Sequence, residues 1–163
     1  MTDDVMKQLN TAMRQIRRAK WFNKDWTLRA TEPDDGRSHW AGIQLAKKNW
    51  FNEDGLGIHL ETWVSEKEMP SNQLPFVLHV LHQKTFPGTD KTTRDFMKLW
   101  RELPEPNELI ASWPGYKTGR IKPLGGKRKY DLENIPSTIV EEFTRLHVLD
   151  VYVDQVLSEI LGD

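Results

Sequence analysis

A change in the spacing of apolar residues divides this chain into three parts and constrains its fold more than any other feature. Residues 3–20 repeat apolar side chains every three or four positions, which is typical of an amphipathic helix. The middle part alternates apolar and polar side chains with a period of two, which is typical of strands with one solvated face. This alternation covers three segments, residues 26–31, 39–47 and 57–64, and the largely apolar residues 76–82 are predicted as a fourth strand. Helical spacing returns in the last part, from residue 92 onward.

The connections between the four predicted strands are short and rich in turn-forming residues. Pro33-Asp34-Asp35-Gly36 separates the first two segments, and Asn52-Glu53-Asp54-Gly55 separates the next two. Antiparallel strands accept such short connections, whereas parallel strands need a longer crossover. The sequence therefore predicts one α+β domain over residues 1–163. We expect an antiparallel four-stranded meander with an N-terminal helix and C-terminal helices packed on the sheet.

Composition limits the cellular setting and the chemistry. The chain has no cysteine, which excludes disulfides, thiolate zinc ligands and a cysteine nucleophile. No apolar run approaches the roughly 20 residues that span a bilayer, and residues 1–4 lack the basic start of a secretory signal. We therefore expect a cytoplasmic protein without a membrane partner.

A basic segment lies between Trp113 and Tyr130. The chain has a net charge of −1, yet this segment contains six cations and no acid. With two prolines and four glycines in residues 114–130, we predict a loop. Lysine and arginine neutralise phosphates, and neighbouring aromatic rings stack on bases, so nucleic acid or another polyanion is one predicted partner. The alternative is a solvated loop that balances the acidic remainder. The predicted ligand-binding cations are Lys117, Arg120, Lys122, Lys127, Arg128 and Lys129.

A second candidate site lies on the sheet. Period-two alternation places His59, Glu61 and Trp63 on one strand face, and neighbouring strands can bring Gln44 and His79 beside them. Imidazole and carboxylate groups are suited to general acid–base catalysis, and two histidines with a carboxylate can also hold a metal. We predict His59, Glu61 and His79 as catalytic residues, with Gln44 and Trp63 as ligand-binding residues. We assign no metal ligand and leave the cofactor open, since the alternative is a solvated face with a simple cross-strand pair.

Tryptophan is abundant, with seven residues in the chain. Trp40 and Trp63 alternate onto the candidate face, where indole rings can stack on a planar ligand or a sugar. The alternative is that the indoles fill the space between sheet and helices. We expect Trp63 to face the ligand because it shares a strand face with His59 and Glu61.

The sequence leaves three functions open. It contains no P-loop, dinucleotide fingerprint, nucleophile elbow, zinc-protease helix or EF-hand loop. The first expectation is a non-catalytic intracellular binding module for an anionic ligand or nucleic acid, acting through the basic loop. The second is a hydrolase-type enzyme that uses Glu61 with His59 or His79. The third is a structural or oligomer-forming protein, with a second copy of the chain as its partner.

Overall fold

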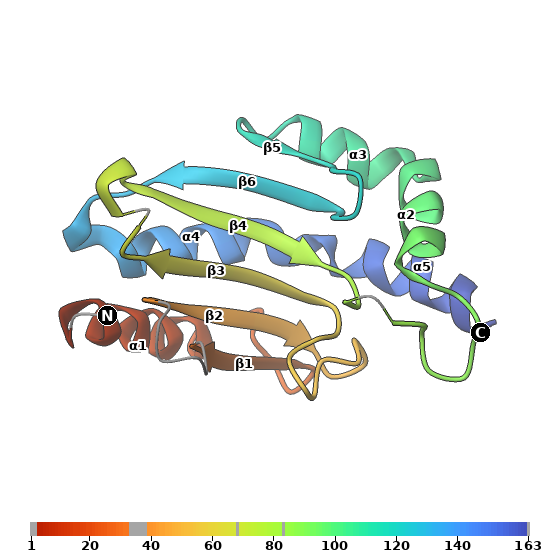
Figure 1. The fold of residues 1–163 in the computed structure, drawn as a ribbon, viewed down its shortest axis with the longest axis horizontal. Helices are drawn as coiled ribbons and strands as arrows, with labels where there is room; N and C mark the ends of the chain where they lie inside the picture. The colour runs from red at the N-terminus through yellow and green to blue at the C-terminus, as the bar shows by residue number, and fades with distance from the viewer. Residues whose placement is uncertain (1–2, 33–38, 68, 83, 163) are drawn as a thin grey trace.

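The computed structural model describes residues 3–32, 39–67, 69–82 and 84–162, and it confirms an α+β fold with one antiparallel sheet (Figure 1). The six strands lie in the order β1-β2-β3-β4-β6-β5. They are β1 (Trp26–Thr31), β2 (Trp40–Lys47), β3 (His59–Ser65), β4 (Gln73–His79), β5 (Tyr116–Lys117) and β6 (Leu124–Lys129). The helices are α1 (Asp3–Arg17), α2 (Thr93–Glu102), α3 (Pro104–Ala111), α4 (Ile135–Leu146) and α5 (Asp150–Leu161). None of these helices is long and apolar enough to cross a membrane.

The first four strands form the predicted antiparallel meander, each paired with the next along the chain. The turn predicted at Pro33-Asp34-Asp35-Gly36 lies outside the described residues. The turn that begins at Asn52 is present, and Gly55 adopts the left-handed conformation with a φ of 79°. Glycine adopts this conformation without a steric penalty from a Cβ atom, so the turn chemistry read from the sequence holds here.

The prediction of four strands was wrong, because residues 114–130 are not a loop. β6 lies between β4 and β5 and pairs with both. The two strands β6 and β5 therefore extend the sheet beyond β4. Gly126 has a packing role, since a Cβ atom there would lie 2.4 Å from the Tyr116 ring. A glycine normally signals a break in a strand, but Gly126 makes room for the Tyr116 ring.

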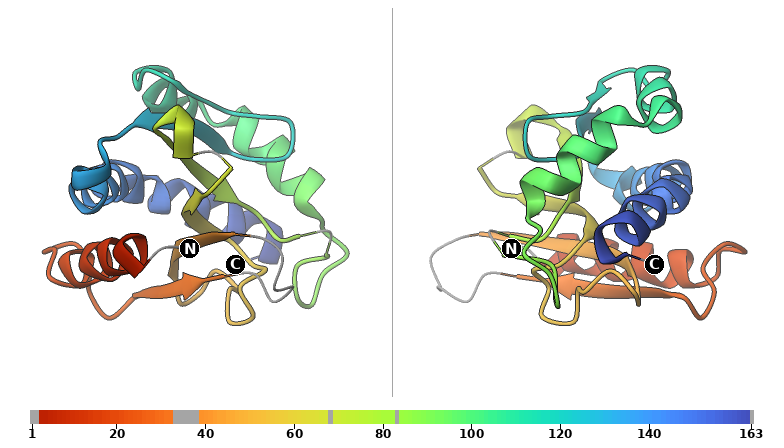
Figure 2. Two further views of the ribbon diagram at one scale, coloured as in Figure 1. Left: turned by 60° about the vertical axis from the view of Figure 1, so that its left-hand side comes forward. Right: turned by 90° about the vertical axis from the view of Figure 1, so that its right-hand side faces the viewer.

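Three helices, α1, α4 and α5, cover one face of the sheet, as Figure 2 shows most clearly in its right-hand view. The helical pattern at the C-terminus is divided into α4 and α5 by a short 3-10 segment, His147–Leu149. Phe143 and Leu146 of α4 are fully buried in the core. α2 begins with a capping interaction, in which the Thr92 backbone N–H donates to the Asp95 carboxylate at 2.7 Å.

The two faces of the sheet differ in composition. The face toward α1, α4 and α5, here called the covered face, carries apolar side chains such as Leu45, Leu60 and Phe76, each no more than 1% exposed. The opposite face, here called the open face, is turned toward the viewer in Figure 1 and is not covered by those helices. Its strand positions include Glu61 and His79, which are both partly exposed. The alternation of each strand therefore places the polar candidates away from the core.

Candidate functional site

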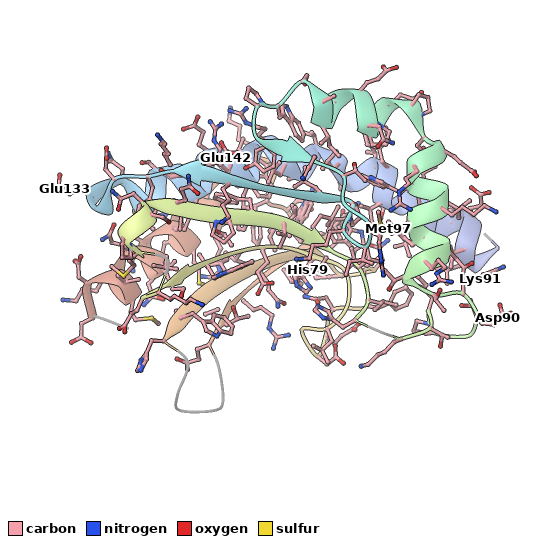
Figure 3. All side chains as sticks on the ribbon, turned by 45° about the horizontal axis from the view of Figure 1, so that its top comes forward. His79, Asp90, Lys91, Met97, Glu133 and Glu142 are labelled. Carbon is pink, nitrogen blue, oxygen red and sulfur yellow. The ribbon has the colours of Figure 1, made fainter. Side chains whose placement is uncertain are left out.

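The open face contains a pocket with a volume of about 300 Å³. Its lining residues come from β2, β3 and β4: Trp40, Glu61, Trp63, Ser65 and His79. Figure 3 labels His79 at its position on the sheet. Gly42 lies directly opposite Trp63 across β2 and β3, and a Cβ atom at Gly42 would come within 3.1 Å of the Trp63 Cβ. The glycine thus allows a large indole at this point of the open face.

Strand register brings His59, Glu61 and His79 together, and we call them the histidine–glutamate cluster. His59 lies directly opposite His79 on β4, and Glu61 is two residues along β3 on the same face. The His79 Nε2 atom lies 3.2 Å from Glu61 Oε2, and the His59 Nε2 atom lies 3.5 Å from the same oxygen. His59 is 1% exposed, whereas the Glu61 and His79 side chains are 13% and 14% exposed. The cluster therefore has one fully buried member and two members that reach the pocket.

Burial and mutual contact shift the protonation equilibria of the cluster. Burial alone favours the neutral Glu61 carboxyl, but the His59 and His79 imidazoles, in their protonated form, outweigh it and lower the Glu61 pKa to about 2. Burial lowers the pKa of His59, and the Glu61 carboxylate offsets that effect only in part. At neutral pH the cluster therefore combines an ionised carboxylate with an uncharged, buried imidazole.

A buried hydrogen-bond network supports the cluster from the side away from Glu61. Asn52 Oδ1 lies 2.9 Å from His59 Nδ1 and also accepts the Gly57 backbone N–H at 3.0 Å. Asn52 Nδ2 donates to Gln44 Oε1 at 3.1 Å, and Gln44 Nε2 donates to the Gly55 carbonyl at 3.2 Å. Sequence reasoning missed Asn52, whose only signal was its place in a turn. Its side chain bonds to Gln44 and His59, and no periodicity reveals such a contact.

Within the described part of the chain, His59, Glu61 and His79 form the group of acidic and imidazole side chains whose ligand atoms lie within 4.8 Å of one another. No family model, curated protein or solved structure matches this chain. A functional assignment therefore depends on the chemistry of the pocket and the cluster.

Of the two predicted ligand-binding residues on the sheet, one lines the pocket and the other belongs to the buried hydrogen-bond network. Trp63 lines the pocket together with Trp40. Gln44 lies directly opposite Glu61, as the alternation suggested, but its side chain is buried and its amide bonds to Asn52 and Gly55. Gln44 thus belongs to the supporting network and does not line the pocket.

The six predicted basic residues do not form one surface. Lys127 and Lys129 are exposed strand positions, whereas Arg128 points to the covered face, where its Nε lies 3.1 Å from a Glu142 oxygen of α4. Alternation along β6 separates neighbours that the sequence presents as one run. The other three lie on β5 or in the β5–β6 connection: Lys117 and Arg120 are exposed, and Lys122 is half-buried.

His82 lies beside the cluster, although strict alternation from His79 would place it on the opposite face of an extended strand. β4 ends at His79, so the alternation does not extend to His82. Its ring lies 5.2 Å from the His79 ring and is stacked 6.1 Å from the His59 ring. Burial and the neighbouring His79 lower the His82 pKa.

Proposed function

We propose that this protein is a hydrolase-type enzyme that acts on a small molecule in the open-face pocket. The observation that carries the proposal is the convergence of His79 and Glu61 beside two tryptophans in one cavity. Concave sites with aromatic walls and a few convergent polar groups are typical of small-molecule sites, and about 300 Å³ lies at the small end of their range.

The cluster supplies groups that can activate a water molecule. Glu61 is an ionised carboxylate within 3.2 Å of the His79 imidazole, and a carboxylate of this kind orients an imidazole and stabilises its positive charge. Both side chains are mostly withdrawn from solvent, which strengthens electrostatic interactions between them and a substrate. These properties favour catalysis over a simple solvated cross-strand pair.

The pocket walls indicate how a substrate is held. Trp40 and Trp63 present indole surfaces on adjacent strands, and such surfaces stack on planar or sugar rings. Ser65 adds a hydroxyl group that both donates and accepts hydrogen bonds. We infer a small substrate with one ring and one hydrolysable group.

The basic strand supports the alternative binding function less well. Arg128 is engaged by Glu142, so the segment offers fewer free cations than its sequence suggests. The exposed Lys127 and Lys129 remain available to an anionic ligand. Polyanion binding by these two lysines is compatible with an enzyme, because they lie outside the pocket.

The test is a screen of wild-type protein against chromogenic phosphoester, ester and glycoside substrates, repeated with Glu61→Gln and His79→Gln. We expect hydrolysis of one class, reduced at least about 100-fold by each substitution, as is usual for a group that acts in proton transfer. Glu133→Gln is the matched control, because Glu133 lies in the 3-10 segment Leu132–Asn134, outside the pocket. Failure of wild type on all three classes, or full activity in Glu61→Gln, would overturn the proposal.

A further inference from the structure

We propose that His59 Nε2, His79 Nε2 and a Glu61 oxygen bind one divalent first-row transition-metal ion, with Zn²⁺ as the simplest occupant. The inference rests on the proposed hydrolase function and refines it: the three side chains would activate water by holding a metal ion, in place of direct proton transfer by His79 and Glu61. Two observations support it: which groups around His59 donate and which accept hydrogen bonds, and the distances between the ligand atoms.

Backbone groups fix which way the supporting amides point. The Gly55 carbonyl can only accept a hydrogen bond, so Gln44 must place its NH₂ group there and turn Oε1 toward Asn52. Asn52 must then donate Nδ2–H to Gln44, which leaves Oδ1 for the Gly57 N–H and for His59. Each step follows from the chemistry of a donor or an acceptor.

The Asn52 oxygen therefore sets the tautomer of His59. Since Oδ1 can only accept, His59 Nδ1 must carry a hydrogen and donate it at 2.9 Å. A neutral imidazole protonated at Nδ1 has a lone pair at Nε2. A hydrogen-bonded partner at the distal nitrogen is the usual arrangement behind a metal-ligating histidine, because it orients the ring and raises its basicity.

The His59 lone pair faces a carboxylate. His59 is 1% exposed, and its Nε2 has no hydrogen-bond partner in the part of the structure that is described. Glu61 Oε2, which is also an acceptor, lies 3.5 Å from it. Two acceptors that face each other in a buried site repel unless a proton or a cation lies between them. A proton would create a buried imidazolium with little hydration, whereas a metal ion satisfies both atoms at once.

The three ligand atoms all lie within 4.8 Å of one another, and the two separations from Glu61 suit a small metal ion. Two ligand atoms about 2.1 Å from a tetrahedral ion lie about 3.4 Å apart. The observed separations from Glu61 Oε2 are 3.2 Å to His79 Nε2 and 3.5 Å to His59 Nε2. Two imidazoles favour zinc, iron, cobalt or nickel over the oxygen-seeking Mg²⁺ and Ca²⁺.

The three protein ligands leave one coordination position open. Two histidines and one carboxylate occupy three positions, and a catalytic zinc keeps a fourth for water. Glu61 and His79 line the pocket, so a fourth ligand would face Trp40 and Trp63. In hydrolysis the bound water loses a proton to solvent, and its oxygen bonds to the electrophilic atom of the substrate. The bond to the leaving group then breaks, and the leaving group takes up a proton from solvent.

The first experiment measures binding of Zn²⁺ to chelator-treated protein by isothermal titration calorimetry. We expect one ion per chain, and at least about 100-fold weaker binding for His59→Gln, Glu61→Gln and His79→Gln. Asn52→Ala should weaken binding about 10- to 100-fold by releasing the His59 ring. His39→Gln is the matched control, because it removes one exposed histidine outside the cluster and should leave the affinity unchanged.

A second measurement uses only wild-type protein and therefore does not depend on whether a variant folds. Long-range proton–nitrogen NMR spectra of metal-free wild type should show His59 protonated at Nδ1, with an Nε2 signal that shifts on addition of Zn²⁺. Sub-stoichiometric Zn²⁺ binding, a proton on His59 Nε2 in the neutral ring, or equal loss in His39→Gln would overturn the metal site.

The metal site and the proposed function fail in different ways. Metal binding without hydrolysis of any substrate would keep the site and overturn the hydrolase. Hydrolysis by chelator-treated protein that takes up no Zn²⁺ would keep the hydrolase and overturn the site.

Discussion

Two carboxylates on opposite faces of one sheet show how differently the same side chain can be used. Glu142 of α4 points to the covered face, and its side chain is 2% exposed. It accepts a hydrogen bond from the Tyr116 hydroxyl at 2.6 Å and lies 3.1 Å from Arg128 Nε and 3.7 Å from Arg145 Nε. Figure 3 labels Glu142 and His79, one from each cluster. The charge of Glu142 is matched by donors, which is what a buried carboxylate needs for stability.

Glu61 on the open face has different hydrogen-bond partners. Its neighbours are two imidazoles, and the buried Nε2 of one of them, His59, has no hydrogen-bond partner among the described residues. A cluster whose donors and acceptors are all paired cannot bind a further ligand. A cluster beside a pocket with an unpaired acceptor can. The comparison indicates that burial of a charge alone does not mark a functional site. The feature that distinguishes the cluster is an unpaired buried ring nitrogen that faces a carboxylate beside a pocket.

Core packing against the covered face should produce the largest effect on stability. Phe143 is fully buried, and its ring meets that of Phe76 edge-on at 5.9 Å. We expect Phe143→Ala to lower the free energy of unfolding by about 3–5 kcal/mol, because a large cavity remains. Trp63→Ala on the open face should lower it by less than half of that amount. Urea denaturation of both variants measures the difference, and equal losses would show that the open face is part of the core.

Replacement of each carboxylate by its amide tests the comparison directly. Glu142→Gln should lower the free energy of unfolding by about 2–3 kcal/mol, somewhat below a fully buried pair because Arg128 is 31% exposed. Glu61→Gln in chelator-treated protein at pH 8, above the ordinary titration range of histidine, should change it by about 0.5 kcal/mol or less. Urea midpoints at pH 8 are the measurement. A larger loss for Glu61→Gln would reverse the roles assigned to the two clusters.

The Tyr116–Glu142 hydrogen bond gives the covered face a specific dependence on pH. Burial, and then the neighbouring carboxylate, raise the Tyr116 pKa above its ordinary value of 10. A raised pKa stabilises the folded state fully below pH 10, and the contribution declines as pH increases further. Tyr116→Phe should therefore lower the free energy of unfolding by about 1.5–2 kcal/mol at pH 8. The difference from wild type should shrink by about 1.4 kcal/mol per pH unit above pH 10. A difference that stays constant between pH 8 and pH 11 would contradict this account.

The basic strand offers the smallest effect on stability and a separate effect on binding. Replacing Lys127 and Lys129 together by alanine should change the free energy of unfolding by about 0.5 kcal/mol or less, because both are exposed. It should reduce binding to a DNA duplex and lower the salt-dependence slope by about 0.9 for each phosphate that is no longer neutralised. Lys7→Ala with Lys20→Ala removes the same charge from exposed positions elsewhere and serves as the control. Equal losses in both pairs would assign the binding to net charge, and no binding by wild type would remove the polyanion hypothesis.

Local chemistry was enough to predict much of the fold from the sequence. Period-two alternation identified β1 to β3, a largely apolar run identified β4, and helical spacing identified α1, α2 and α4. β5 and β6 were missed, because Gly125-Gly126 and the charges after them are typical of a loop. That segment becomes a strand through pairing with β4, which no local window reveals.

The sequence by itself determined that His59, Glu61 and Trp63 share one strand face, since alternation depends only on the geometry of an extended chain. Only the tertiary structure decided that His79 lies opposite His59, because the register depends on how the strands pair across the whole sheet. It also decided that Arg128 pairs with Glu142 on the covered face and that Asn52 orients His59 from a turn. The site depends on these contacts between distant residues, whose energies arise only when the chain brings the groups together.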